Sequence, residues 1–148
     1  MNLLALTIGL ILATYAIVHF RAFRLEKKQW AYPLLLATFP LYYFVFAIYA
    51  GDHGALLNEM YVSAIFIAAA YAGYKLQNSI GVIILATGYI GHAVYDVAHN
   101  HLFINDGTPF WWPEFCGAVD GLMGLYLVYL AFSFRANRVD TQERNSTG

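Results

Sequence analysis

The sequence predicts an all-α integral membrane bundle of five transmembrane helices. In 148 residues, hydrophobic side chains make up 60% and charged side chains 11%, against about 45–50% and about 25% in soluble domains. Five apolar stretches also reach the length of about 20 residues that a helix needs to cross the hydrocarbon core. This composition excludes a soluble globular enzyme. A net charge of −1 gives no electrostatic reason to bind nucleic acid, so no nucleic-acid partner is expected.

The predicted spans follow one another through short polar connections. We expect them at Asn2–His19, Trp30–Ala50, Leu56–Tyr74, Ile80–His99 and Glu114–Phe134. Residues 1–134 therefore form a five-helix transmembrane domain, and residues 135–148 form a polar cytoplasmic tail that we expect to be loose. The first span is expected to be a retained helix rather than a signal peptide, because no positive charge precedes it.

Every lysine and arginine lies on one side of the predicted bundle. These residues follow the first, third and fifth spans: Arg21, Arg24, Lys27, Lys28, Lys75, Arg135, Arg138 and Arg144. Because basic loops stay on the cytoplasmic side, we expect the N-terminus outside and the C-terminus in the cytoplasm. The sequence thus predicts a protein of the bacterial inner (plasma) membrane. The end of the bundle that lacks lysine and arginine is expected to face the periplasm or the exterior.

Ionisable side chains within the spans gather toward the outer side. His92, Asp96 and His99 share one face of the fourth span, within a stripe about 60° wide. Asp120 lies in the fifth span and Glu59 in the third, and a rise of about 1.5 Å per residue puts both near the same depth as the stripe. Because charged groups are costly in a bilayer, the sequence predicts that these residues line one pocket.

Imidazole and carboxylate groups together suit a divalent transition metal. We predict a zinc site, with copper, iron or manganese as alternatives, whose ligands are His92, Asp96, His99 and Asp120. Glu59 is expected to be a further ligand or the catalytic base. Further pocket residues are expected among His53, Ser63, Tyr95, His101 and Cys116. A metal-free acid/base pocket and a purely structural polar network are the alternatives.

A zinc ion that activates water favours hydrolysis, and a pocket within the bilayer favours a lipid-like substrate, so membrane lipids are the expected partners. The alternative functions are an accessory subunit of a larger membrane complex, a copper- or zinc-handling protein, and a metal-free isomerase or proton-relay transporter. Gly117, Gly121 and Gly124 also share one face of the fifth span. Small residues let helices approach closely, so we expect this face to pack within the chain, in a homo-oligomer or in a larger complex.

The segment from Gly91 to Gly121 resembles a family of small, uncharacterised bacterial integral membrane proteins, which implies no established activity. The resemblance is carried by His92-x3-Asp96-x2-His99, by Trp112-Pro113-Glu114-Phe115-Cys116 and by Asp120.

Two characterised groups are similar in part. Alkaline ceramidases hold zinc in a membrane bundle with three histidines and an aspartate and hydrolyse lipid amides, which implies His92, His99 and Asp120 as ligands. This chain departs from that pattern because it has five predicted spans rather than seven and lacks Ser-x3-His. Sterol isomerases of the emopamil-binding type shuttle a proton without metal and carry a His-x3-acid pair, which His92 and Asp96 match.

Overall fold

The structure, a computed structural model, is a bundle of α-helices. It describes residues 2–76 and 78–146, with side chains for residues 2–76 and 78–133. Within these residues the elements are α1 (Leu3–Ala22), the 3-10 turn η1 (Leu25–Lys27), α2 (Ala31–Ala50), α3 (His53–Leu76), α4 (Ser79–Leu102) and α5 (Trp112–Ser146). The described residues contain no β-strand, so the prediction of an all-α fold is confirmed.

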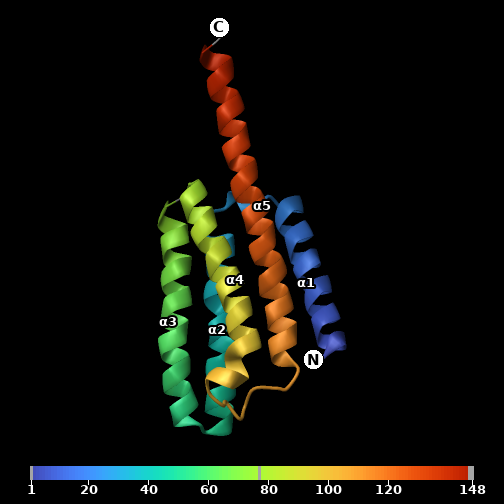
Figure 1. Ribbon diagram of the computed structural model, residues 1–148, viewed down its shortest axis with the longest axis vertical. Helices are drawn as coiled ribbons and strands as arrows, with labels where there is room; N and C mark the ends of the chain where they lie inside the picture. Colours follow the sequence, from blue (N-terminus) through green and yellow to red (C-terminus); the bar gives the residue numbers. More distant parts are fainter. Residues whose placement is uncertain (1, 77, 147–148) are drawn as a thin grey trace.

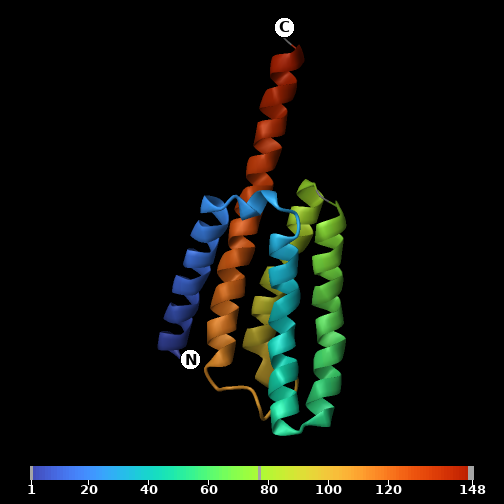
Figure 2. The same ribbon diagram turned by 180° about the vertical axis from the view of Figure 1, so that it is seen from behind.

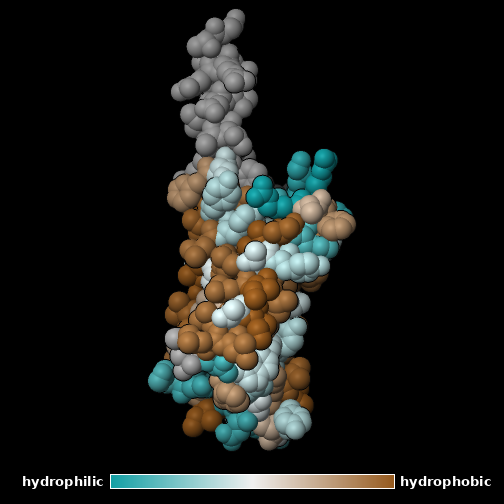
Figure 3. Space-filling view, turned by 90° about the vertical axis from the view of Figure 1, so that its right-hand side faces the viewer, coloured by the Kyte–Doolittle hydropathy of each residue, from teal (hydrophilic) through white to brown (hydrophobic). Residues whose placement is uncertain are grey.

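All five helices are long and apolar enough to cross a membrane. Four of the spans cover whole helices of 20 to 24 residues, and the fifth covers Trp112–Ser133 of α5. The prediction of five helices with the length and composition of membrane spans is therefore confirmed. Hydrophobic side chains dominate the face drawn in Figure 3, between hydrophilic residues near both ends of the bundle. Such a surface matches the hydrocarbon core and the two interfaces of a bilayer.

Polar caps set where the helices begin. Asn2 accepts a hydrogen bond from the backbone N–H of Ala5 at the start of α1. Asp52 does the same for Ala55, so α3 begins at His53 and not at Leu56 as predicted. A side-chain acceptor at this position satisfies an N–H that has no partner within the helix. The loop between α2 and α3 is therefore shorter than the sequence predicted.

The last helix is longer than the apolar span that it contains. Residues 135–148 were expected to be loose, yet α5 continues as a helix to Ser146 and projects beyond the bundle (Figure 1). Residues 135–146 are thus helical, residues 147–148 lie outside the described part, and a polar cytoplasmic tail stays a prediction. The sequence has neither glycine nor proline between Gly124 and Gly148. These two residue types oppose helix formation most strongly, so nothing in this stretch ends the helix.

The helices are arranged so that α5 contacts both α1 and α4, while α3 contacts both α2 and α4 (Figures 1 and 2). The N-terminus, the α2–α3 junction and the α4–α5 loop lie at one end of the bundle, which we call the loop end. The basic turn η1 and the α3–α4 junction lie at the other end. The side of the membrane that each end faces stays a prediction.

The glycine face of α5 packs against α4. A Cβ atom added to Gly117 would lie 3.5 Å from the carbonyl oxygen of Ala93, and one added to Gly124 would lie 2.6 Å from the side chain of Ile90. The absence of side chains thus lets the two helices approach closely within the chain, which is the first of the three arrangements we expected. It also brings the ionisable groups of α4 and α5 together. Association between chains stays a prediction.

Candidate metal centre

The ionisable face of α4 points into the bundle. His92, Asp96 and His99 each have 0% of their surface exposed, as a stripe at helical spacing predicts. Apolar side chains are about equally stable against lipid and against other helices. They therefore do little to decide which face of α4 points into the bundle. The cost of leaving imidazole and carboxylate groups in hydrocarbon therefore fixes which side of α4 faces the other helices.

Four side chains from α4 and α5 meet in the interior. His92 and Asp96 come from α4, and Cys116 and Asp120 come from α5, one turn apart on each helix. One nitrogen, oxygen or sulfur atom from each residue lies within 4.8 Å of the corresponding atoms of the others. His92 Nδ1 is 2.7 Å from Asp120 Oδ2 and 3.4 Å from Asp96 Oδ2, and Cys116 Sγ is 3.6 Å from Asp120 Oδ2. We call these four residues the centre.

The centre has spare capacity for polar interactions. Asp96 Oδ2, Asp120 Oδ1 and His92 Nε2 are buried and make no hydrogen bond to any described residue. Buried polar atoms in folded proteins nearly always have a partner, and a carboxylate oxygen in a bilayer has no water to replace one. Asp96 Oδ2 lies within ion-pair distance of His92 Nδ1, at 3.4 Å, but makes no hydrogen bond, and Asp120 Oδ1 makes none either among the described residues. These two buried oxygens therefore favour a ligand that interacts with oxygen.

The donor set fits a metal ion. Ligands placed tetrahedrally around zinc at about 2.0–2.3 Å stand about 3.3–3.8 Å apart. The candidate atoms of the centre lie within 4.8 Å of one another, and the closest pair, His92 Nδ1 and Asp120 Oδ2, is 2.7 Å apart. Imidazole, thiolate and carboxylate are all ligands that zinc accepts. A divalent cation also offsets the charge of two fully buried aspartates that face a single imidazole. The four residues could therefore hold one ion, with ligation in place of the hydrogen bond between His92 and Asp120.

The centre differs from the ligand set expected from sequence. Three of the four expected residues are present, and Cys116 stands where His99 was expected. His92 and His99 are seven residues apart, which is about 10 Å along a helix. The two imidazoles therefore lie in different layers, although they share one face of α4. Cys116 was expected only as a further pocket residue, yet it belongs to the centre.

No family model, curated protein or solved structure matches this chain. Any functional assignment therefore depends on the side chains and their geometry.

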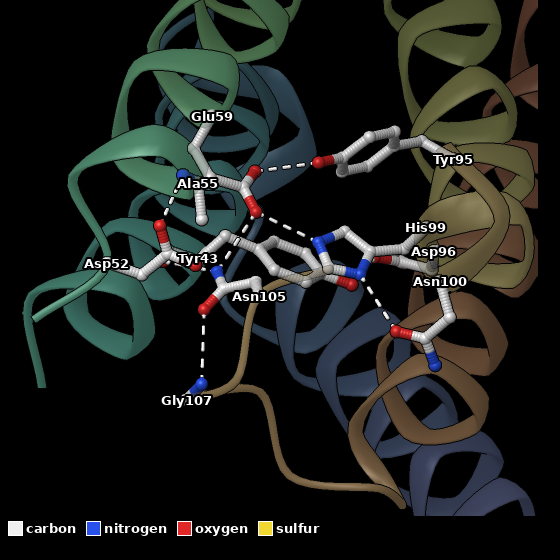
Figure 4. Close-up of polar contacts among 10 residues, drawn as sticks. All are labelled: Tyr43, Asp52, Ala55, Glu59, Tyr95, Asp96, His99, Asn100, Asn105 and Gly107. Carbon is white, nitrogen blue, oxygen red and sulfur yellow. Dashed lines mark hydrogen bonds and ion pairs between the residues drawn. The ribbon is translucent and has the colours of Figure 1, made fainter. Parts of the chain in front are cut away.

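A second buried group lies one layer closer to the loop end. We call Glu59, Tyr95, His99 and Asn105 the Glu59 network. The Tyr95 hydroxyl donates to Glu59 Oε2 at 2.6 Å, while His99 Nε2 at 2.9 Å and the Asn105 amide at 3.1 Å reach Glu59 Oε1. Figure 4 shows the carboxylate of Glu59, from α3, enclosed by these three side chains. Both oxygens of this carboxylate are thus engaged.

Tyr43 connects the two groups. Its hydroxyl donates a hydrogen bond to Asp96 Oδ1 at 2.7 Å, so it holds one carboxylate of the centre. Its ring stacks on the imidazole of His99 with the ring centroids 4.4 Å apart, and its backbone carbonyl accepts from the Asn105 amide at 3.2 Å. A group that orients a metal ligand in this way is typical of metal sites.

The other expected pocket residues lie in three different surroundings. Ser63 is buried on α3, one turn from Glu59, and its hydroxyl makes no hydrogen bond to the described residues. Tyr95 belongs to the Glu59 network. His53, the first residue of α3, and His101, in the last turn of α4, are exposed to the surroundings. The structure therefore brings neither of these two histidines into the centre.

Sequence reasoning missed Tyr43 and Asn105. Tyr43 lies in α2, where almost every residue is apolar, so no polar stripe marks the inner face of that helix. Asn105 lies in the α4–α5 loop and is only 4% exposed, whereas a run of asparagine, aspartate and glycine normally indicates a solvated turn. Neither residue carries a periodic signal.

Proposed function

We propose that this protein holds one divalent transition-metal ion, with zinc favoured, at His92, Asp96, Cys116 and Asp120, and uses it to hydrolyse a lipid-like substrate. The observation that carries the proposal is the pair of buried aspartate oxygens without a hydrogen-bond partner among the described residues, beside an imidazole and a thiol within ligand distance. A zinc ion supplies Lewis acidity and activates water for hydrolysis.

Cys116 narrows the choice of metal. A thiolate ligand favours zinc, copper or iron over manganese, which prefers oxygen ligands. The expectation from sequence treated zinc, copper, iron and manganese as compatible with nitrogen and oxygen ligands. We now rank manganese last, because one of the four donors is sulfur.

We propose Asp120 as the general base, in place of Glu59, which the sequence suggested. A general base must reach its proton donor at about 2.6–3.2 Å, and both oxygens of Glu59 are held by Tyr95, His99 and Asn105. Asp120 Oδ1 belongs to the centre and has no hydrogen-bond partner among the described residues. Hydrolysis needs a water molecule on the ion, so Asp120 would give up its place on the ion to that water and accept its proton. We therefore assign proton acceptance to Asp120 and a positioning role to Glu59.

The substrate is proposed to be lipid-like because of where the centre lies. Its four residues belong to two helices that are apolar enough to cross a membrane, and all four are at most 1% exposed. A water-soluble substrate would have to leave water to arrive there, whereas a molecule dissolved in the bilayer is already at that depth.

Metal analysis tests the proposal. The protein is purified in mild detergent without a histidine tag, and its metal content is measured by mass spectrometry. We expect about one zinc, copper or iron ion per chain, lost in His92→Ala and in Cys116→Ala. His99→Gln is the matched control, because His99 lies outside the centre and this variant should keep its metal. A folded wild-type protein without metal, or loss of metal only in His99→Gln, would contradict the proposal.

The enzymatic part needs a separate assay. Fatty acid released from a detergent-solubilised lipid mixture should fall on chelation and return when zinc is added. A metal-loaded protein with no such activity would instead support the second candidate, a zinc- or copper-handling protein. One observation favours this alternative: four protein ligands saturate a tetrahedral ion, as in structural sites, whereas catalytic sites usually keep one position open.

A further inference from the structure

An apolar groove runs along the bundle between α1, α2 and α5. Its volume is about 380 Å³, within the range of small-molecule sites. Each helix contributes residues spaced by three or four positions along one face: Leu12 and Ala16, Leu35 and Phe39, and Val119 and Met123. All three helices qualify as membrane spans, so the groove lies at the depth of the hydrocarbon core.

The groove opens to the surface that faces lipid. Its rim includes Leu12 and Tyr42, each 46% exposed, whereas Phe39 is 9% and Met123 0% exposed. Exposure therefore falls steadily from the rim to the floor. Figure 3 shows that hydrophobic side chains predominate on the face formed by α1 and α5. Because the groove is continuous with a surface that hydrocarbon covers, its occupant must itself be apolar along most of its length.

The groove extends along α5, and Trp112 lines it near the loop end. Trp112 and Met123 both line it and are 11 residues apart on α5, which corresponds to about 16 Å. Trp112 is 8% exposed, and its indole N–H has no hydrogen-bond partner among the described residues. A buried donor of this kind requires an acceptor. An amphiphile with a carbonyl oxygen at one end and a hydrocarbon tail supplies both parts.

Cys116 joins the groove to the centre. It lines the groove, and its sulfur contacts Asp120. Along α5 it stands one turn from Trp112, so both residues lie on the face of α5 that lines the groove. The apolar tail would then extend toward Val119 and Met123, away from the loop end.

We infer that the groove binds one acyl chain of a membrane lipid, with its carbonyl oxygen near Trp112 and its tail along Val119 and Met123. The inference rests on the proposed function only for the chemistry that follows binding. It names the substrate class as an acyl lipid that enters sideways from the bilayer, between α1 and α2. Binding of the chain needs no metal.

Photolabelling tests the inference. The protein in lipid nanodiscs is mixed with palmitic acid that carries a diazirine on its tail, irradiated and mapped by mass spectrometry. Labelling of Leu35 or Val119 that unlabelled palmitic acid competes away is the expected result, because bulk lipid covers the outer surface and is not displaced. Labelling confined to exposed residues such as Ile65, 67% exposed on α3, with no competition, would overturn the inference.

Two variants fill the groove. Ala16→Trp places a large ring on its wall, and Leu12→Trp does the same at the rim, where the fold tolerates a larger side chain. Both should abolish the labelling that palmitic acid competes. Ala68→Trp, at an exposed position of α3, is the matched control and should leave it unchanged. Equal competed labelling in all three variants would overturn the inference.

A third variant tests the polar end. Trp112→Phe keeps an aromatic ring and removes the N–H, so palmitic acid should compete about 3- to 10-fold less well, as expected for one lost hydrogen bond. Unchanged competition would overturn the contact with the carbonyl oxygen. Metal content separates this inference from the proposed function: Ala16→Trp should keep its metal, and His92→Ala should lose metal while palmitic acid still competes in its groove.

Discussion

The centre and the Glu59 network are two buried polar groups of the same bundle, yet they differ in how their atoms are satisfied. In the network, both oxygens of Glu59 accept hydrogen bonds. In the centre, two aspartates face one imidazole, and an oxygen of each aspartate makes no hydrogen bond to the described residues. Both groups lie among membrane spans, so their surroundings do not explain the difference.

Under the proposed function, this difference separates a group that stabilises the fold from one that binds a metal ion. A fully paired carboxylate holds helices in register and gains little from an added ion. An incompletely paired carboxylate raises the energy of the folded state until a cation or a proton arrives. The network therefore fixes α3, α4 and the α4–α5 loop around Tyr43, and the centre uses the rigidity that results.

Removing the carboxylate of the network should have the largest effect on stability. Glu59→Ala leaves Tyr95, His99 and Asn105 without their acceptor, which should cost about 2–5 kcal/mol of unfolding free energy. Denaturation of the protein in mixed micelles measures it, with Glu59→Gln as the milder control. Metal content per folded chain should not change. Loss of metal in a folded Glu59→Gln protein would show that the two groups are not separate.

Removing the metal should have the second-largest effect on stability. If the ion is present at about 100 to 1,000 times its dissociation constant, its binding stabilises the folded state by about 3–4 kcal/mol. A chelator should therefore lower the unfolding temperature of the wild type. The same treatment should not change His92→Ala, which has no metal to lose. Equal responses of the two proteins would contradict a metal site at His92.

Breaking the connection between the two groups should have a smaller effect on stability. Tyr43→Phe removes the hydrogen bond to Asp96 and keeps the ring beside His99, so the loss should be about 1 kcal/mol. Metal affinity should fall more clearly, by about 10- to 100-fold, because an orienting contact is lost. Competition with a fluorescent chelator measures it. Tyr61→Phe, at a position 76% exposed, is the matched control, and equal affinity in both would contradict the role of Tyr43.

The smallest effect on stability is expected in the metal-free protein with Asp120→Asn. This change removes one of two buried carboxylates that compete for His92, so the unfolding free energy should change by less than about 1 kcal/mol or rise. Metal binding should nevertheless be lost. Glu59→Gln is the informative comparison. It should lower the unfolding free energy of the metal-free protein, yet it should leave the metal content of the purified protein unchanged. A strongly destabilised Asp120→Asn protein would place Asp120 in a structural network instead.

The sequence predicts the bundle well because span length and polarity are local properties. It predicts the burial of His92, Asp96 and His99 for the same reason, since a polar stripe in a membrane helix has only one favourable side. It does not predict how helices are rotated and shifted against one another. That relation decides that Cys116 faces His92, and that His99 faces Glu59 one layer away.

Two further residues show why the rest of the site could not be predicted. In a soluble helix, the contrast between apolar and polar faces would mark Tyr43 as buried, but α2 is apolar on its lipid-facing side too. Asn105 lies in a loop whose composition favours a solvated turn. Its burial depends on the contacts with Tyr43 and Glu59, which are distant in the sequence.

X-ray absorption at the metal edge of the purified protein tests the central claim most directly. The centre predicts one sulfur ligand at about 2.3 Å and three nitrogen or oxygen ligands at about 2.0–2.2 Å. A shell made only of nitrogen and oxygen in the wild type would contradict a centre that includes Cys116.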